Sequence, residues 1–229
     1  AQGRAGHGSM MNDENALTAL TEAVAKIGRY EWPQRYTKTV KILFKKIAEA
    51  TGKTYNEEDL RPLLKEIGPT ARMIGATLQN TANPTMLEAG YKANVIPGSA
   101  SAVVDGRFLP GYEDELNATI RQIVGPDIVV ETVTRDIALE VDFQGDLVDA
   151  MIASIVRQDP EGIPVPYTMS GGTDNKALSE LGIVGYGFSP LKLPADLDFM
   201  ALFHGVDERV PIDGLEFGAR VLKDFLENC

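Results

Sequence analysis

The chain has 229 residues, which is enough for one large domain or two smaller ones. Hydrophobic residues make up 44% of it and charged residues 24%, a balance that excludes a disordered or fibrous protein. The formal net charge is -11, and no basic block compensates for it, which argues against a nucleic-acid partner or an anionic membrane surface.

The only cysteine is the last residue, Cys229, so no disulfide can form within the chain. The sequence also has no apolar run of membrane-spanning length and no recognisable signal peptide, and we therefore expect a cytoplasmic protein. The chain opens without Met in a glycine-rich stretch at residues 1–9. Because termini fray, residues placed for chemistry rarely lie so close to a true terminus, and we expect further residues upstream or a processed chain.

Helical patterns dominate the first third of the chain. Apolar residues recur at helical spacing after a helix-start cluster at residues 12–15, and Gly28 supplies a stop. Further helical segments lie between residues 32 and 80, where the aromatic and apolar positions suit a core better than a ligand site. We interpret residues 32–80 as a helical insertion.

Strand patterns follow the insertion. The expected elements are strands over residues 85–89 and 99–109, a helix over 113–124 and a last strand over 128–135. With a first strand ahead of the first helix, the order is βαββαβ, that of an α+β ferredoxin-like sandwich with helices on one face of an antiparallel sheet. The uncovered edge strand of such a sheet is a natural dimerisation surface.

The last third of the chain alternates between helix and strand. The expected elements are helices over residues 146–158 and 173–181, strands over 165–169 and 183–188, and a final helix. This alternation is typical of an α/β sheet, but two strands are too few for a sheet covered on both faces. We therefore divide the chain into a βαββαβ unit over residues 1–139 and part of an α/β domain over residues 140–229.

Three polar residues of the first unit occur at turns or strand ends. His7 stands between two glycines, where the backbone can approach a ligand closely. Asn94 precedes a Val-Ile-Pro-Gly turn, and Arg107, two positions after Asp105, offers a planar fork for a substrate carboxylate. Each also fits an ordinary role: a frayed terminal residue, a turn former and half of a surface ion pair.

Two further candidates lie in the second unit. Gly171, Gly172 and Thr173 connect a predicted strand to a helix N-terminus, where free N–H groups bind anions. His204 lies between an apolar run and a cluster of carboxylates, a setting that suits metal ligation. A plain strand-to-helix connection and a solvated surface loop are the alternative interpretations.

Taken in order, these motifs resemble the M20 family of metallopeptidases and aminoacylases, which includes carboxypeptidase G2, succinyl-diaminopimelate desuccinylase and acetylornithine deacetylase. The segments Gly-His-Gly-Ser, Asn-Val-Ile-Pro-Gly and Asp-Gly-Arg-Phe-Leu-Pro-Gly are similar to its lid domain. The segments Ser-Gly-Gly-Thr-Asp and His-Gly-Val-Asp-Glu-Arg-Val are similar to the C-terminal half of its catalytic domain. The resemblance makes residues 1–139 a lid or dimerisation domain and residues 140–229 the C-terminal part of a zinc-hydrolase domain.

The resemblance also implies roles for the lid residues. His7 corresponds to a histidine that reaches into the other subunit's site in family dimers and stabilises the oxyanion of the tetrahedral intermediate. Asn94 and Arg107 correspond to groups that hold the substrate, the arginine by its carboxylate. A homodimer through the lid domain is therefore expected.

For the catalytic part, the resemblance implies that His204 is a ligand of a two-zinc centre, in which cobalt can substitute. Gly171, Gly172 and Thr173 correspond to a turn that contacts the substrate near the metals. Asp207 and Glu208 correspond to an acidic pair that lies beside the metal ligands and does not itself bind the metals.

The reaction implied is hydrolysis of an amide or peptide bond beside a carboxylate, in N-acyl amino acids or dipeptides, by metal-activated water. The family's other metal ligands and its general base precede the lid, and this sequence does not include them. We therefore expect a C-terminal portion of a hydrolase that is inactive alone. A non-catalytic dimerising or binding module and a family member that has lost activity are the alternatives, and the side-chain specificity is left open.

Overall fold

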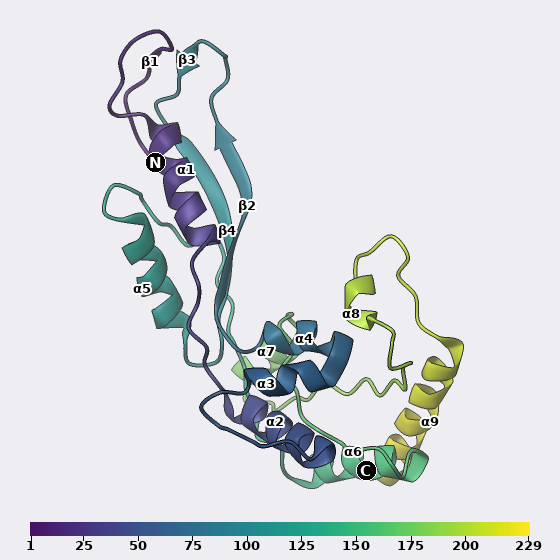
Figure 1. Cartoon of the computed structure of the whole chain (residues 1–229). Helices are drawn as coiled ribbons and strands as arrows, with labels where there is room; N and C mark the ends of the chain where they lie inside the picture. Colours follow the sequence, from purple (N-terminus) through teal and green to yellow (C-terminus); the bar gives the residue numbers. More distant parts are fainter. The chain divides into compact units, whose positions relative to one another are not determined.

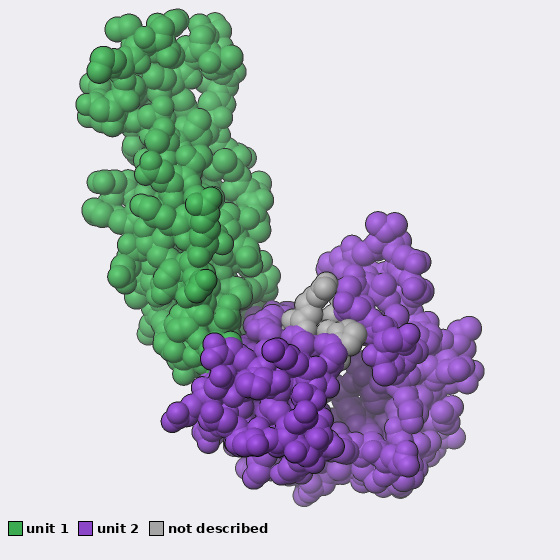
Figure 2. Space-filling model, viewed as in Figure 1, with its two compact units in different colours: residues 1–35, 79–138 green, residues 36–78, 139–229 purple. Residues whose placement is uncertain are grey.

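The computed structural model describes residues 1–68, 71, 74–199 and 201–229. It contains two compact units (Figure 2). Unit 1 consists of Ala1–Arg35 and Gln79–Ala138, and unit 2 consists of Tyr36–Leu78 and Leu139–Cys229. Most of the segment interpreted as an insertion therefore belongs to unit 2. The division into a lid over residues 1–139 and part of a catalytic domain over residues 140–229 stays a prediction.

Unit 1 combines short strands with two amphipathic helices. In chain order its elements are β1 (Gly6–His7), α1 (Ala16–Gly28), β2 (Thr81–Ala89), β3 (Val95–Ile96), β4 (Ala100–Arg107) and α5 (Glu113–Val124) (Figure 1). Helix α1 begins where the Asn15 side chain accepts hydrogen bonds from the N–H groups of Leu17 and Thr18, at 3.0 and 3.2 Å. Helix α5 begins with three acidic residues, which suit the positive end of the helix dipole.

The strands of unit 1 form two antiparallel pairs, β1 with β3 and β2 with β4. The N-terminal residues extend the first pair: the N–H of Ala100 donates to the carbonyl of Ala1 at 3.1 Å, and the N–H of Gly3 donates to Gly98 at 2.9 Å. A bulge follows Pro84 in β2, where proline has no N–H to give to the ladder.

The strand expected over residues 128–135 is absent. These residues form no ladder in the structure, and Val129 and Val133 are 69% and 84% exposed. Alternation of apolar residues stabilises a strand only where a neighbouring strand accepts its hydrogen bonds and one face is covered. The mixed helix and strand content is thus as expected, but the complete ferredoxin-like βαββαβ arrangement is not confirmed.

The core of unit 1 lies between its helices and the β2–β4 pair. Helix α1 packs against β2, β4 and α5 (Figure 1). One cluster of buried side chains consists of Ile27, Trp32, Ala82 and Leu116, and a second of Ala16, Leu20 and Ala100. A Cβ on Gly106 would lie 3.0 Å from a methyl carbon of Leu116, so this glycine allows α5 to approach the sheet closely.

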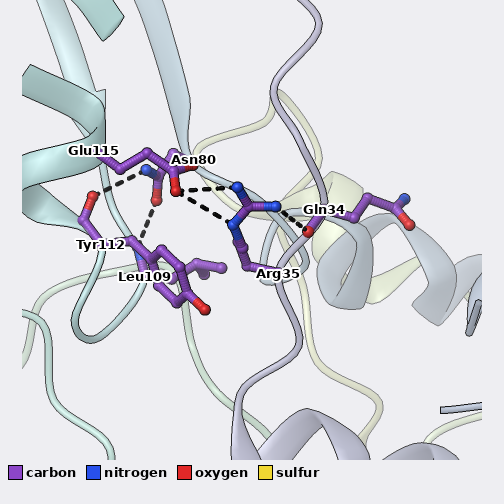
Figure 3. Close-up of polar contacts among 6 residues, drawn as sticks. All are labelled: Gln34, Arg35, Asn80, Leu109, Tyr112 and Glu115. Carbon is purple, nitrogen blue, oxygen red and sulfur yellow. Dashed lines mark hydrogen bonds and ion pairs between the residues drawn. The ribbon is translucent and has the colours of Figure 1, made fainter. Parts of the chain in front are cut away.

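A polar cluster lies where the chain first leaves unit 1, after residue 35, and where it re-enters this unit, at residue 79 (Figure 3). The buried Asn80 accepts a hydrogen bond from the N–H of Leu109 at 2.9 Å and donates to the carbonyl of Tyr112 at 3.1 Å. The Arg35 guanidinium donates twice to one oxygen of Glu115, at 3.2 and 3.1 Å (Figure 3). The Asn80 amide thus fixes the loop ahead of α5 to the chain at residue 80, and the ion pair fixes the first turn of α5 to the chain at residue 35.

Unit 2 is helical in its described residues. Its elements are α2 (Lys38–Thr51), α3 (Arg61–Leu64), η1 (Lys65–Thr70), α4 (Ala71–Gly75), α6 (Asp146–Gln158), α7 (Asn175–Glu180), α8 (Phe199–Leu202) and α9 (Ile212–Asn228). Helix α2 begins at Thr37, whose hydroxyl accepts from Val40, and ends at Gly52, which has a left-handed φ of 65°. Its buried face joins α3 and α4 in one core, and α6 packs against α9.

The strands expected over residues 165–169 and 183–188 are also absent. Both stretches are irregular, and Tyr167, Met169 and Val184 remain exposed. The reason is again the lack of partners, since the part of unit 2 that the structure describes contains no strand with which they could pair. The expected helices over residues 146–158 and 173–181 are present as α6 and as the shorter α7. Among the described residues, no helix combines the length and the apolar character needed to span a membrane.

We expect Gly3→Ala to destabilise unit 1 by about 1–3 kcal/mol. A Cβ at this position would lie 2.2 Å from the carbonyl oxygen of Glu14 and 2.6 Å from the nitrogen of Ala16, and both are backbone atoms that cannot turn aside. The fluorescence of Trp32, the one tryptophan, reports the unfolding of this unit in urea. Gly6→Ala is the matched control, because its Cβ would meet nothing nearer than 3.9 Å. Equal midpoints for the two variants would contradict the prediction.

Asn80→Ala is expected to lower the free energy of unfolding of unit 1 by about 1–3 kcal/mol, because it leaves the N–H of Leu109 and the carbonyl of Tyr112 without their partner. Urea titration followed by Trp32 fluorescence measures the change. Asn117→Ala, on the exposed side of α5, removes the same amide from a helix interior and should leave stability unchanged or slightly raised. A loss of stability as large in the control would show that the buried bonds are not responsible.

Candidate functional site

The structure brings His7 and Asn94 together at one end of unit 1. His7 ends β1 and lies opposite Val95 of β3. The N–H of Gly8 donates to the carbonyl of Asn94 at 2.9 Å, and the N–H of Met10 donates to the carbonyl of His7 at 2.9 Å, which closes a tight turn. Both candidate side chains are exposed, so this tip presents an imidazole and an amide to solvent.

The His7 ring is oriented by Ser9. The Nδ1 atom lies 2.8 Å from the Ser9 hydroxyl oxygen, and the backbone N–H of Ser9 donates to the same nitrogen at 3.3 Å. Sequence reasoning identified His7 as a candidate but assigned no role to Ser9. The available signal was the His-x-Ser spacing, which allows a turn residue to bond back to the imidazole two positions earlier.

Arg107 lies at the other end of β4, opposite Thr81 of β2. With a rise of about 3.3 Å per residue, β4 separates it from the tip region by roughly 20 Å. The guanidinium binds Asp105 with both arms, Nε to Oδ1 at 2.7 Å and Nη2 to Oδ2 at 2.9 Å. The two side chains lie on the same face of the strand because they are two positions apart. Arg107 is therefore not brought together with His7 and Asn94 within unit 1.

The Asp105–Arg107 pair changes the protonation equilibria of both groups. The hydrogen bonds from Arg107 lower the pKa of the Asp105 carboxyl below its ordinary value of 3.8, and partial burial opposes this shift. The same hydrogen bonds raise the pKa of the Arg107 guanidinium. Arg107 is thus a permanent cation whose fork already holds a carboxylate.

In unit 2, Gly171, Gly172 and Thr173 form an exposed connection ahead of the six-residue helix α7. The carbonyl of Thr173 accepts from the N–H of Lys176 at 3.1 Å and starts the first turn of this helix. No side chain caps α7. The three residues are therefore available at the surface, with backbone groups as their only means of contacting a ligand apart from the Thr173 hydroxyl.

His204 follows α8 and has an unusual backbone conformation. Its φ of 56° lies in the left-handed region, and it is the one non-glycine residue with a positive φ in the part of the chain that the structure describes. Left-handed backbone at a non-glycine residue costs free energy and occurs often at functional sites. The His204 side chain is exposed, and the neighbouring Asp207 carboxylate is bound to Arg209 rather than directed to the imidazole.

The metal-binding capacity of this chain is limited by its donors. Within the described residues, no group of three or more His, Cys, Asp or Glu side chains lies close enough to hold a metal ion. A two-zinc centre needs several such ligands. The residues present therefore do not fit a complete dinuclear site, and His204 is the single candidate ligand that the sequence motifs identify.

Known proteins are similar to this chain over most of its length. The family model for the peptidase dimerisation domain of M20 proteins matches residues 1–129. The chain is 26% identical to a probable carboxypeptidase S-like 2 of Dictyostelium discoideum, over 90% of this chain and 41% of the relative. It is also 26% identical to the N-fatty-acyl-amino acid synthase/hydrolase PM20D1 of Bos taurus, over 97% of this chain and 46% of the relative.

Solved structures agree with this likeness at the level of the fold. An M20 family metallo-carboxypeptidase from Sulfolobus solfataricus matches 94% of this chain and 52% of its own length, with a TM-score of 0.58 and 17% identity. The chain thus spans about half the length of the relatives that it matches. The family model covers more than half of the chain, including the tip with His7 and Asn94, and the chain accordingly belongs to the M20 peptidase family, whose dimerisation domain it carries.

Proposed function

We propose that this chain is the C-terminal portion of a two-zinc M20 hydrolase that cleaves amide or peptide bonds beside a carboxylate. The observation that carries the proposal is the match of the dimerisation domain to residues 1–129, which contain the His7, Asn94 and Arg107 motifs in family order. The names of two relatives, a carboxypeptidase and an N-fatty-acyl-amino acid synthase/hydrolase, support N-acyl amino acids or peptides as the substrate class.

The exposed tip of unit 1 supplies donors in this proposal. His7 donates a hydrogen bond to the carbonyl oxygen of the scissile bond as negative charge develops on it, and the adjacent Asn94 amide holds the substrate. Both side chains are exposed, so a bound molecule can reach them while the His7 ring keeps its bonds to Ser9. Their action depends on a reacting centre that unit 1 alone does not contain.

Arg107 binds the substrate carboxylate in this proposal. A bidentate guanidinium–carboxylate contact is geometrically specific, and the existing contact with Asp105 has the same geometry. A substrate carboxylate must therefore displace Asp105 or share the guanidinium with it. Asp105 keeps the cation oriented in the absence of substrate and competes with weak anions.

Unit 2 contributes His204 as a zinc ligand and Gly171, Gly172 and Thr173 as a substrate-contacting turn. Zinc, or cobalt in its place, would supply an activated water and polarise the carbonyl. In this proposal the remaining ligands and the general base belong to polypeptide outside this sequence, and the chain alone is inactive. The lack of a three-donor cluster among the described residues supports this part of the proposal.

The partner in this proposal is a second copy of the chain. The matched family model describes a dimerisation domain, and β2 has a paired neighbour on one side only among the described strands. A non-catalytic dimerising module is the second candidate, and the absence of a three-donor cluster among the described residues favours it for the isolated chain. We also propose a cytoplasmic location. The one cysteine, Cys229, cannot form a disulfide within the chain, and a chain without disulfides suits a reducing compartment.

The hydrolase proposal predicts activity for a longer gene product that contains this sequence. With zinc or cobalt it should hydrolyse members of a panel of N-acyl amino acids and dipeptides, and the 229-residue chain should hydrolyse none. His7→Ala should lower kcat by about 10²–10³-fold, the loss typical of one oxyanion donor. Met11→Ala is the control, since this side chain lies near the same tip and is 99% exposed.

Two outcomes would contradict this prediction. One is a fully metal-loaded longer protein that hydrolyses nothing in the panel. The other is tight, stoichiometric binding of two zinc ions by the isolated 229-residue chain, because the ligand count would then be wrong. Binding of no zinc together with dimerisation would assign the module role to this chain and leave hydrolysis to the longer protein.

The Asp105–Arg107 pair predicts a measurable titration. The pKa of Asp105 should lie below 3.8 in the folded chain and should rise to about its ordinary value in Arg107→Gln. Because the folded-state pKa is lowered, the stabilisation from the pair is present above the ordinary pKa and is lost as the pH falls through the folded-state value. Carboxyl-detected NMR follows the titration directly.

Arg135→Gln is the matched control for this titration. It breaks the similar bidentate pair of Arg135 with Glu113 and should leave the pKa of Asp105 unchanged. An Asp105 titration that is the same in the wild-type chain and in Arg107→Gln would show that Arg107 is not held by Asp105 in solution.

A further inference from the structure

The contacts of His7 at the tip of unit 1 determine which of its ring nitrogens carries the proton. In a neutral imidazole one nitrogen donates and the other accepts, and the hydrogen bond made by one nitrogen determines the state of the other. The partners of Nδ1 are the backbone N–H of Ser9 at 3.3 Å and the Ser9 hydroxyl at 2.8 Å.

The backbone N–H of Ser9 has only one possible role. An amide N–H donates and cannot accept, so the nitrogen that it faces must present a lone pair. A proton on Nδ1 would point at the amide hydrogen and lose this bond. The hydroxyl adapts to either state, because it can rotate to donate or to accept. With Nδ1 unprotonated, the hydroxyl donates to the lone pair that it shares with the amide N–H, and this arrangement places the ring proton on Nε2.

The turn that holds Ser9 is itself fixed by backbone bonds. The carbonyl of His7 accepts from the N–H of Met10 at 2.9 Å, and the N–H of Gly8 donates to Asn94 at 2.9 Å. Both bonds are independent of the His7 and Ser9 side chains. The position of the Ser9 amide relative to the ring thus follows from the pairing of β1 with β3.

We propose that Ser9 is a positioning residue that holds His7 in its Nε2–H tautomer, so that the tip presents an N–H donor to its ligand. The proposal rests on the proposed function in one respect, namely that the ligand atom is the carbonyl oxygen of the scissile bond. A donor is needed there, because developing negative charge on oxygen is stabilised by N–H groups and not by a lone pair. Ser9 thereby determines which ring nitrogen of His7 carries the proton, and it does so without contacting the substrate.

The tautomer can be read directly from the 229-residue chain by NMR. Long-range correlation between ring protons and ring nitrogens distinguishes the two neutral tautomers in a ¹⁵N-labelled sample at about pH 8.5, well above the ordinary imidazole pKa of about 6.5. The chain has two histidines, and His204→Asn leaves the His7 signals alone in the spectrum. We expect Nδ1 without a proton and the proton on Nε2.

Ser9→Ala tests the contribution of the hydroxyl. The hydroxyl can bond to Nδ1 in either tautomer and the backbone N–H remains, so the proton should stay mainly on Nε2. Ser9→Pro removes the backbone N–H itself and should shift the ratio of the tautomers toward Nδ1–H by about two- to tenfold relative to Ser9→Ala. Ser101→Ala, which removes an exposed hydroxyl from β4, should leave the ratio unchanged.

The backbone amide spectrum of each variant shows whether the turn is intact, and the wild-type tautomer decides the question even if Ser9→Pro disturbs it. A wild-type His7 with its proton mainly on Nδ1, or a ratio identical in Ser9→Ala and in an intact Ser9→Pro variant, would overturn the proposal. The measurement uses neither metal nor substrate. A longer protein without hydrolase activity would therefore count against the proposed function and leave the tautomer result standing.

Discussion

The antiparallel pairing of residues 1–8 with residues 94–100 is the constraint on which the candidate site depends. It joins segments that are about ninety positions apart through backbone bonds between Ala1 and Ala100, Gly3 and Gly98, and Gly8 and Asn94. Bringing segments so far apart in the sequence together costs conformational entropy, because a long loop must be closed. The buried apolar contacts of α1 with β2 and β4 offset this cost. With that pairing in place, an imidazole and an amide from distant motifs become neighbours.

Local patterns predicted the helices well and the strands only in part. Helices α1, α2, α5 and α6 follow from apolar spacing and end signals that lie within each segment, so no distant partner is needed to recognise them. The β2–β4 hairpin was also predictable, because its two strands lie close together in sequence. Residues 128–135, 165–169 and 183–188 have strand-like alternation without a ladder, since a strand is stable only with a neighbour that the sequence pattern does not reveal.

The candidate residues differ in how far sequence could place them. The proximity of His7 and Asn94 depends on the long-range register of β1 and β3, which no local motif encodes. The pairing of Arg107 with Asp105 was foreseeable, because residues two apart share a strand face. The left-handed conformation of His204 and the bonding of Ser9 to the His7 ring are products of turn geometry, and spacing alone does not determine them.

The two units differ in what they can do by themselves. In unit 1, the turn of His7 is closed by backbone bonds and the ring is oriented by Ser9, so the tip is ordered by contacts within this unit. In unit 2, His204 stands without a cluster of further donors among the described residues, and the predicted strands lack partners. A tip that is already organised binds with a smaller loss of conformational entropy than one that must order on binding. The exposed tip of unit 1 is therefore arranged in advance by contacts within this unit, whereas His204 in unit 2 has no such arrangement among the described residues.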